Sequence, residues 1–124
     1  MTFRLAQGLL WSQLVLLLVG TQMPNAARAA LEAGLHSPWG LSSWAHFGLF
    51  AGMAAVACAR PMAWPWHRVL LAALCLALGS EALQFFASDR HPRWLDVGID
   101  MAGAVVGWGV VRWHGLPRRW RASQ

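Results

Sequence analysis

Polar and ionisable side chains interrupt otherwise apolar stretches of this sequence. Glu81 and Gln84 are three residues apart and Asp96 and Asp100 are four apart, so each pair would share one face of an α-helix. His46 interrupts a further apolar stretch. Histidine and carboxylates can act as general acids and bases, or can hold a ligand through hydrogen bonds to its hydroxyl and amino groups. These residue types indicate a binding site or a catalytic site.

Arg90 lies between the two pairs in the sequence. Its guanidinium is a planar fork of donors that matches phosphate or carboxylate. The sequence has no HExxH motif, no nucleophile elbow and no phosphate-binding glycine loop. We therefore assign no catalytic residue, no metal site and no cofactor, and treat the polar residues as ligand-binding candidates.

Two glycines extend the spacing of the aspartates. Asp96, Asp100, Gly103 and Gly107 stand at i, i+4, i+7 and i+11, which is one stripe along a helix. Glycines four residues apart let another helix approach closely. We expect Gly103 and Gly107 to be helix-packing positions, so that the stripe turns both aspartates toward the other helices.

The composition indicates that these polar groups belong to a membrane protein. Apolar residues make up 57% of the 124 and charged residues only 12%, about half the share in an ordinary soluble domain. The net charge of +5 comes from arginines beside apolar runs, so we predict no nucleic-acid binding. A carboxylate within a membrane span costs at least about 2.5–3.5 kcal/mol, which makes the acidic residues noteworthy.

Four apolar runs are candidate transmembrane helices. They cover residues 5–20, 41–59, 69–86 and 95–111. At about 16–19 residues each, they would span roughly 24–28 Å, slightly less than a typical hydrocarbon core. We predict a single all-α domain over 1–124, an integral membrane four-helix bundle. A cleaved signal peptide is the alternative for the first run, since Arg4 precedes it and residues 27–29 resemble a cleavage site.

The arginines predict the orientation. With four spans, one side of the membrane carries Arg4, Arg60, Arg68, Arg112, Arg118, Arg119 and Arg121. The other side carries Arg28, Arg90 and Arg93. The positive-inside rule then places both termini in the cytoplasm of a bacterial inner-membrane protein. On the outer side, Asn25 as N-cap and Gly34 as C-terminal stop predict a short surface helix over 26–33.

This orientation brings the polar residues to one depth. His46 would lie about one turn inside the outer face, and Glu81 and Gln84 about one to two turns inside it. Asp96 would lie at the start of the fourth span, with Asp100 one turn deeper. Structural roles are the alternatives. His46 could hydrogen-bond a neighbouring helix, and Asp96 could be an N-cap. Glu81 could neutralise Arg90 or Arg93 and so hold the third and fourth helices together.

These same residues carry a resemblance to a known family. The matching positions are His46-Phe47, Glu81-Ala82-Leu83-Gln84-Phe85-Phe86, Arg90, Asp96-Val97, Asp100 and Gly103-Ala104. On them, residues 41–108 resemble the VanZ-like family of small bacterial membrane proteins. Ser42-Ser43 and Ser88-Asp89 depart from the family pattern. The resemblance implies four transmembrane helices and an association with resistance to the glycopeptide teicoplanin.

We expect an envelope protein whose outer-face site binds a lipid headgroup, a cell-wall precursor or a glycopeptide. One alternative is an enzyme acting on a lipid-linked envelope substrate, with His46 and the carboxylates as acid and base. Another is a small subunit that packs on a larger membrane complex through Gly103 and Gly107 or through its tryptophan-rich surface. Membrane lipids are expected partners in each case.

Overall fold

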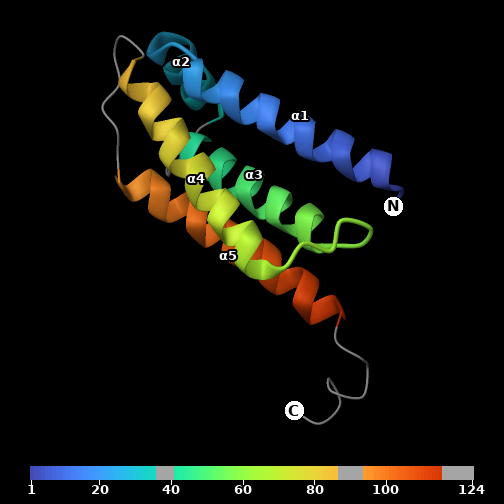
Figure 1. The fold of residues 1–124 in the computed structure, drawn as a ribbon. Coiled ribbons are helices and arrows are strands. Elements are labelled where there is room, and N and C mark those ends of the chain that lie inside the picture. The colour runs from blue at the N-terminus through green and yellow to red at the C-terminus, as the bar shows by residue number, and fades with distance from the viewer. Residues whose placement is uncertain (36–40, 87–93, 116–124) are drawn as a thin grey trace.

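A computed structural model describes residues 1–35, 41–86 and 94–115, and these residues form helices joined by short connections (Figure 1). The five helices are α1 (Phe3–Gln22), α2 (Asn25–Leu35), α3 (Leu41–Cys58), α4 (Trp66–Phe85) and α5 (Trp94–Gly115). The predicted all-α class is confirmed over the described residues.

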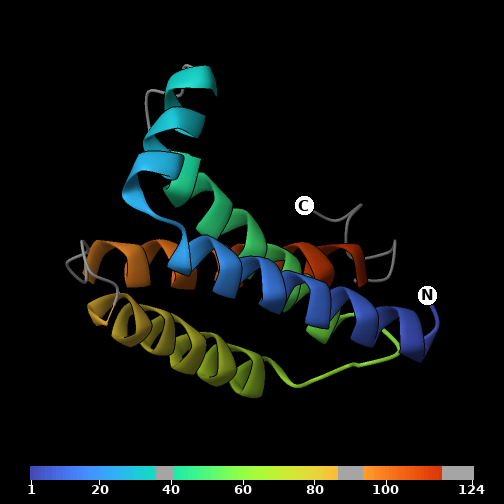
Figure 2. The ribbon, with the colours of Figure 1, turned by 90° about the horizontal axis from the view of Figure 1, so that it is seen from above.

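Four of these helices, α1, α3, α4 and α5, run side by side in alternating directions (Figures 1 and 2). The start of α1, the 59–65 connection and the last turn of α5 lie at one end of the bundle, which we call the arginine end. It carries Arg4, Arg60, Arg68 and Arg112. At the opposite end, the α2 end, α2 stands out to one side and α3 begins.

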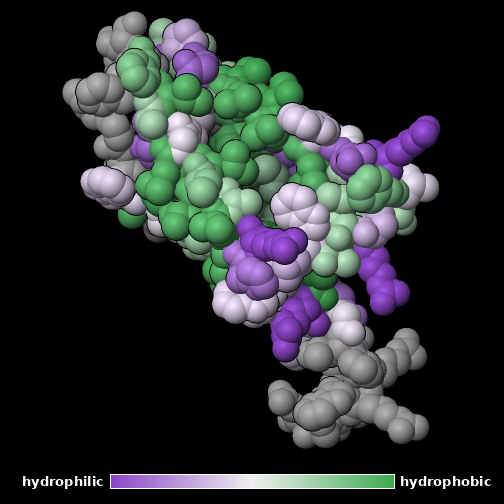
Figure 3. Space-filling view, in the orientation of Figure 1, coloured by the Kyte–Doolittle hydropathy of each residue, from purple (hydrophilic) through white to green (hydrophobic). Residues whose placement is uncertain are grey.

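Three of the helices are long and apolar enough to cross a membrane. They are α1, α4 and α5, whereas the apolar part of α3, Ser42–Cys58, is shorter. Large apolar side chains cover the outside of the bundle, as the green surface in Figure 3 shows. An outer surface of this kind suits lipid rather than water.

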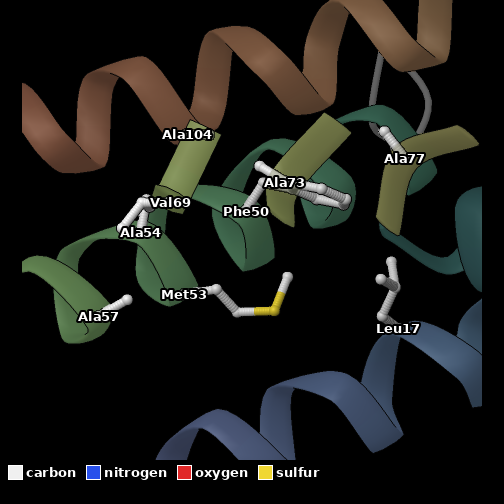
Figure 4. Packing of buried hydrophobic residues seen from close by; sticks show 9 residues of the cluster. All are labelled: Leu17, Phe50, Met53, Ala54, Ala57, Val69, Ala73, Ala77 and Ala104. Carbon is white, nitrogen blue, oxygen red and sulfur yellow. The ribbon is translucent and has the colours of Figure 1, made fainter. Parts of the chain in front are cut away.

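Small residues let α3 lie directly on α5. A Cβ added at Gly103 would collide with the carbonyl oxygen of Phe47, and one at Gly107 with that of Ala51. The remaining core is rich in alanine and includes Leu17, Phe50, Met53, Ala54, Ala57, Val69, Ala73, Ala77 and Ala104. Figure 4 shows Leu17 and Met53 projecting from α1 and α3 into the space between these helices. Close backbone approach replaces bulky side-chain packing between α3 and α5.

The helices extend beyond most of the predicted apolar runs. α1 begins at Phe3, where the Thr2 hydroxyl accepts a hydrogen bond from the Leu5 N–H at 3.3 Å. α4 begins directly after Pro65, and α5 continues to Gly115. Helical hydrogen bonding continues through polar residues at the ends, which a search for apolar runs leaves out.

Two predicted boundaries of the surface helix are wrong, as is the alternative that made Asp96 an N-cap. Asn25 is the first residue of α2 rather than a residue preceding it, and Gly34 lies inside that helix. Asp96 is the third residue of α5 and therefore not its N-cap. Its carboxylate lies in the first turn, where the helix dipole favours negative charge without a capping geometry.

A candidate polar site at the α2 end

The best-defined polar contact joins α3 to α5. His46 Nδ1 lies 3.0 Å from Asp100 Oδ1. The His46 residue is 7% exposed and Asp100 is 0% exposed. His46 is five residues from the start of α3 and Asp100 six residues from the start of α5, so both lie toward the α2 end.

The glycine stripe explains how these side chains meet. Gly103 follows Asp100 by three residues and therefore lies on the same face of α5. The backbone of Phe47, the residue after His46, rests on Gly103. A larger residue at Gly103 would hold α3 away and would separate the imidazole from the carboxylate.

The contact between His46 Nδ1 and Asp100 Oδ1 does not use His46 Nε2 or Asp100 Oδ2. When the imidazole is neutral, Nδ1–H donates to Asp100 and Nε2 becomes an acceptor. Asp100 Oδ2 is buried and accepts no hydrogen bond within the described part of the chain. The carboxylate is thus only half satisfied in an apolar setting, which is costly.

His46 also borders a recess of about 130 Å³ between α1, α2 and α3. The other lining residues are Leu16, Leu17, Gly20, Met23, Leu31, Ser42, Ala45 and Leu49. Ser42 precedes His46 by four residues and adds a hydroxyl to this small, mainly apolar space.

A second polar pair lies in the last turns of α4. Gln84 Nε2 donates to Glu81 Oε1 at 3.3 Å, and the two residues are 5% and 6% exposed. Both are near the α2 end, because α4 ends there at Phe85. Glu81 and Gln84 therefore join His46 and Asp100 as buried polar residues at one end of the bundle.

Asp96 and Arg90 complete the set of predicted residues. Asp96 is half-buried, one turn before Asp100 on α5. Arg90 lies outside the described residues. The structure thus gives contacts for two pairs, His46 with Asp100 and Glu81 with Gln84.

Sequence reasoning missed two residues. Ser42 shares the recess with His46, and its i, i+4 spacing from His46 was an available signal. Gln13 of α1 rests against Gly52 of α3, and its Oε1 is buried without a hydrogen-bond partner in the described structure. An amide within an apolar span was the signal there.

The donor set does not resemble a metal centre. Among the described residues, no cluster of three or more histidines, cysteines or carboxylates is suited to a metal ion. His46 and Asp100 would supply two ligands, fewer than a structural or catalytic zinc site uses.

The VanZ/LLP1 family model matches residues 7–115. The chain belongs to the VanZ/LLP1 family. The match runs from α1 to the last residue of α5, beyond the 41–108 core expected from short motifs. The first span contributes to the VanZ/LLP1 match although it has no short polar motif. Searches of curated proteins and of solved structures found no significant match.

Proposed function

We propose that the protein is a four-span membrane protein of the bacterial envelope. Both termini lie in the cytoplasm, and the site at the α2 end faces outward and binds the headgroup of an envelope lipid or of a lipid-linked cell-wall precursor. Family membership and the apolar outer surface support a membrane protein. The concentration of arginines at the other end supports the orientation.

α3 is the fourth span in this proposal. Its 18 residues cover roughly 27 Å, which a slightly thinned bilayer accommodates. It lies against α5 along Gly103 and Gly107 and also contacts α1 and α4, so it must share their depth.

The observation that carries the function is the buried His46–Asp100 pair. A buried ion pair or polar pair is often no more stabilising than apolar residues of similar volume. Keeping a fully buried aspartate with one unsatisfied oxygen therefore favours a functional role. Asp100 positions the imidazole, and His46 presents Nε2 to a ligand.

The recess limits what this site can hold. Its volume of about 130 Å³ is well below the roughly 300–1,000 Å³ of typical ligand pockets. A phosphate or a few sugar hydroxyls fit, whereas a whole glycopeptide would enter only in part. Arg90, proposed from sequence, would add a donor fork for the phosphate.

Native mass spectrometry of the purified protein tests this proposal. His46→Asn retains an amide near the position of Nδ1, which can still donate to Asp100, but removes Nε2. We expect it to fold and to retain about tenfold less lipid-linked cell-wall precursor, on the order of one lost hydrogen bond. His67→Gln, an exposed histidine at the arginine end, is the matched control. Equal retention by His46→Asn and the wild type would refute the proposal.

The same pair favours a second candidate function, an enzyme acting on a lipid-linked substrate. A carboxylate that is hydrogen-bonded to Nδ1, as Asp100 is to His46, orients the imidazole so that Nε2 can serve as a general base. Turnover of a lipid-linked sugar by the purified protein, lost in His46→Asn, would support it. Absence of turnover across a panel of envelope lipids would leave the binding function.

A structural subunit is a third candidate. The Gly103 and Gly107 face lies against α3, so a partner protein would have to use the exposed tryptophans instead. Co-purification of a stoichiometric partner would support this role.

A further inference from the structure

A second feature lies in the half of the bundle away from the polar site. An apolar groove of about 540 Å³ separates α1 from α4, with α3 beneath it. It is lined by Gln7, Leu10, Trp11, Leu14, Phe50, Met53, Ala54, Ala57, Met62, Trp64, Val69, Ala72, Ala73, Cys75 and Leu76. The face seen in Figure 3 is hollowed between these helices. Its residues are distinct from those of the recess at His46.

The groove results from small side chains on α4. Ala72 and Ala73 are too short to close the gap to Leu10 and Trp11 of α1. Met62 and Trp64 of the 59–65 connection line its arginine-end portion. The groove is therefore bordered by interfacial residues at one end.

Two arginines continue the groove-lining faces toward that end. Arg4 precedes Gln7 by three residues and Trp11 by seven, so it lies on the lining face of α1. Arg68 precedes Ala72 by four residues and lies on the lining face of α4. Both are exposed, and both helices begin toward the arginine end, with α1 starting farther out than α4 (Figures 1 and 2).

We propose that this groove binds one acyl chain of an anionic phospholipid whose headgroup lies between Arg4 and Arg68. The volume of the groove lies within the range of ligand sites. Its lining is almost entirely apolar, so an alkyl chain can fill it without burying unpaired polar groups. Two guanidinium groups at the same end complement a headgroup phosphate. Charge complementarity thus favours an anionic lipid over a neutral one.

The headgroup is tested by native mass spectrometry after equilibration with equal amounts of phosphatidylglycerol and phosphatidylcholine. The wild type should retain phosphatidylglycerol preferentially, and Arg4→Gln/Arg68→Gln should reduce that preference on the order of tenfold. Arg112→Gln is the matched control. Arg112 is at the same end, but its guanidinium lies over the Trp108 ring of α5, with Cζ 5.9 Å from the ring centroid. An equal loss in the control, or no preference in the wild type, would overturn the proposal.

The acyl chain is tested by filling the groove. Ala72→Phe should reduce retention of both lipids by a similar factor, whereas Ala102→Phe, at an exposed position of α5 outside the groove, should not. Unchanged retention in a folded Ala72→Phe protein would refute the proposal. A dimer that Ala72→Phe dissociates would also refute it, because a second copy would then occupy the groove. His46→Asn should leave phosphatidylglycerol retention intact, so the two proposals fail separately.

Discussion

His46 and Asp100 are 54 positions apart in the sequence, and their side chains meet at 3.0 Å between α3 and α5. The contact is buried, and it depends on the close approach of the two helices at Gly103. Packing and polar chemistry are therefore coupled at this point, because the glycine that permits the helix contact also sets the geometry of the pair.

This coupling predicts a measurable interaction energy. In a double-mutant cycle of His46→Ala and Asp100→Ala, we expect a coupling of about 0.6–1.7 kcal/mol in the free energy of unfolding, the range of interhelical hydrogen bonds in membranes. Reversible unfolding in mixed micelles measures it. Additivity within about 0.3–0.5 kcal/mol would show that the two side chains do not interact.

The close contact between α3 and α5 predicts that adding a methyl group at either Gly103 or Gly107 lowers the stability of the fold. Gly107→Ala or Gly103→Ala should destabilise the protein by about 1–3 kcal/mol or more, because the new Cβ meets backbone carbonyls that cannot move independently. Thermal denaturation followed by size-exclusion chromatography measures the loss. Gly98→Ala is the matched control, since its Cβ would meet nothing within 4 Å and should cause no loss. Equal effects at Gly98 and Gly107 would contradict this packing.

Gly52 should behave differently although a Cβ there also meets close contacts. Those contacts come from the side chain of Gln13, which can rotate away. We expect Gly52→Ala to cost clearly less than Gly107→Ala in the same assay, and Gln13→Ala to remove most of that cost. A Gly52→Ala cost that persists in Gln13→Ala would mean that another group limits the space.

Gln13 itself supplies a further prediction. Its Oε1 is buried without a hydrogen-bond partner in the described residues, so replacing the amide by an apolar group of similar size should not destabilise the fold. We expect Gln13→Leu to unfold at the wild-type temperature or higher, with a gain of up to about 1 kcal/mol. A marked loss would indicate that the amide has a partner in the membrane.

The sequence predicted the helices well and their detailed contacts less well. Apolar runs located α1, α3, α4 and α5, because hydrophobic length is the main signal for a membrane span. The Asp100–Gly103–Gly107 stripe was also readable, since helical spacing decides which residues share a face. The start of α4 and the end of α5 could not be predicted from apolar runs, because these helices continue through polar residues such as His67 and Arg112.

The partner of each polar side chain could not be predicted. Spacing within one helix identified Glu81 and Gln84 as neighbours, but pairing His46 with Asp100 needs the relative rotation of α3 and α5. That rotation depends on which glycines meet which backbone atoms. The unpartnered Oε1 of Gln13 likewise appears only when α1 is placed against α3.

Lipid retention by Asp100→Asn is the most direct test of the polar site. The substitution preserves shape and removes the negative charge that positions His46, so we predict a folded protein that retains about tenfold less lipid-linked cell-wall precursor in native mass spectrometry. A folded Asp100→Asn protein with wild-type retention would contradict the account, because the buried carboxylate would then have no part in binding.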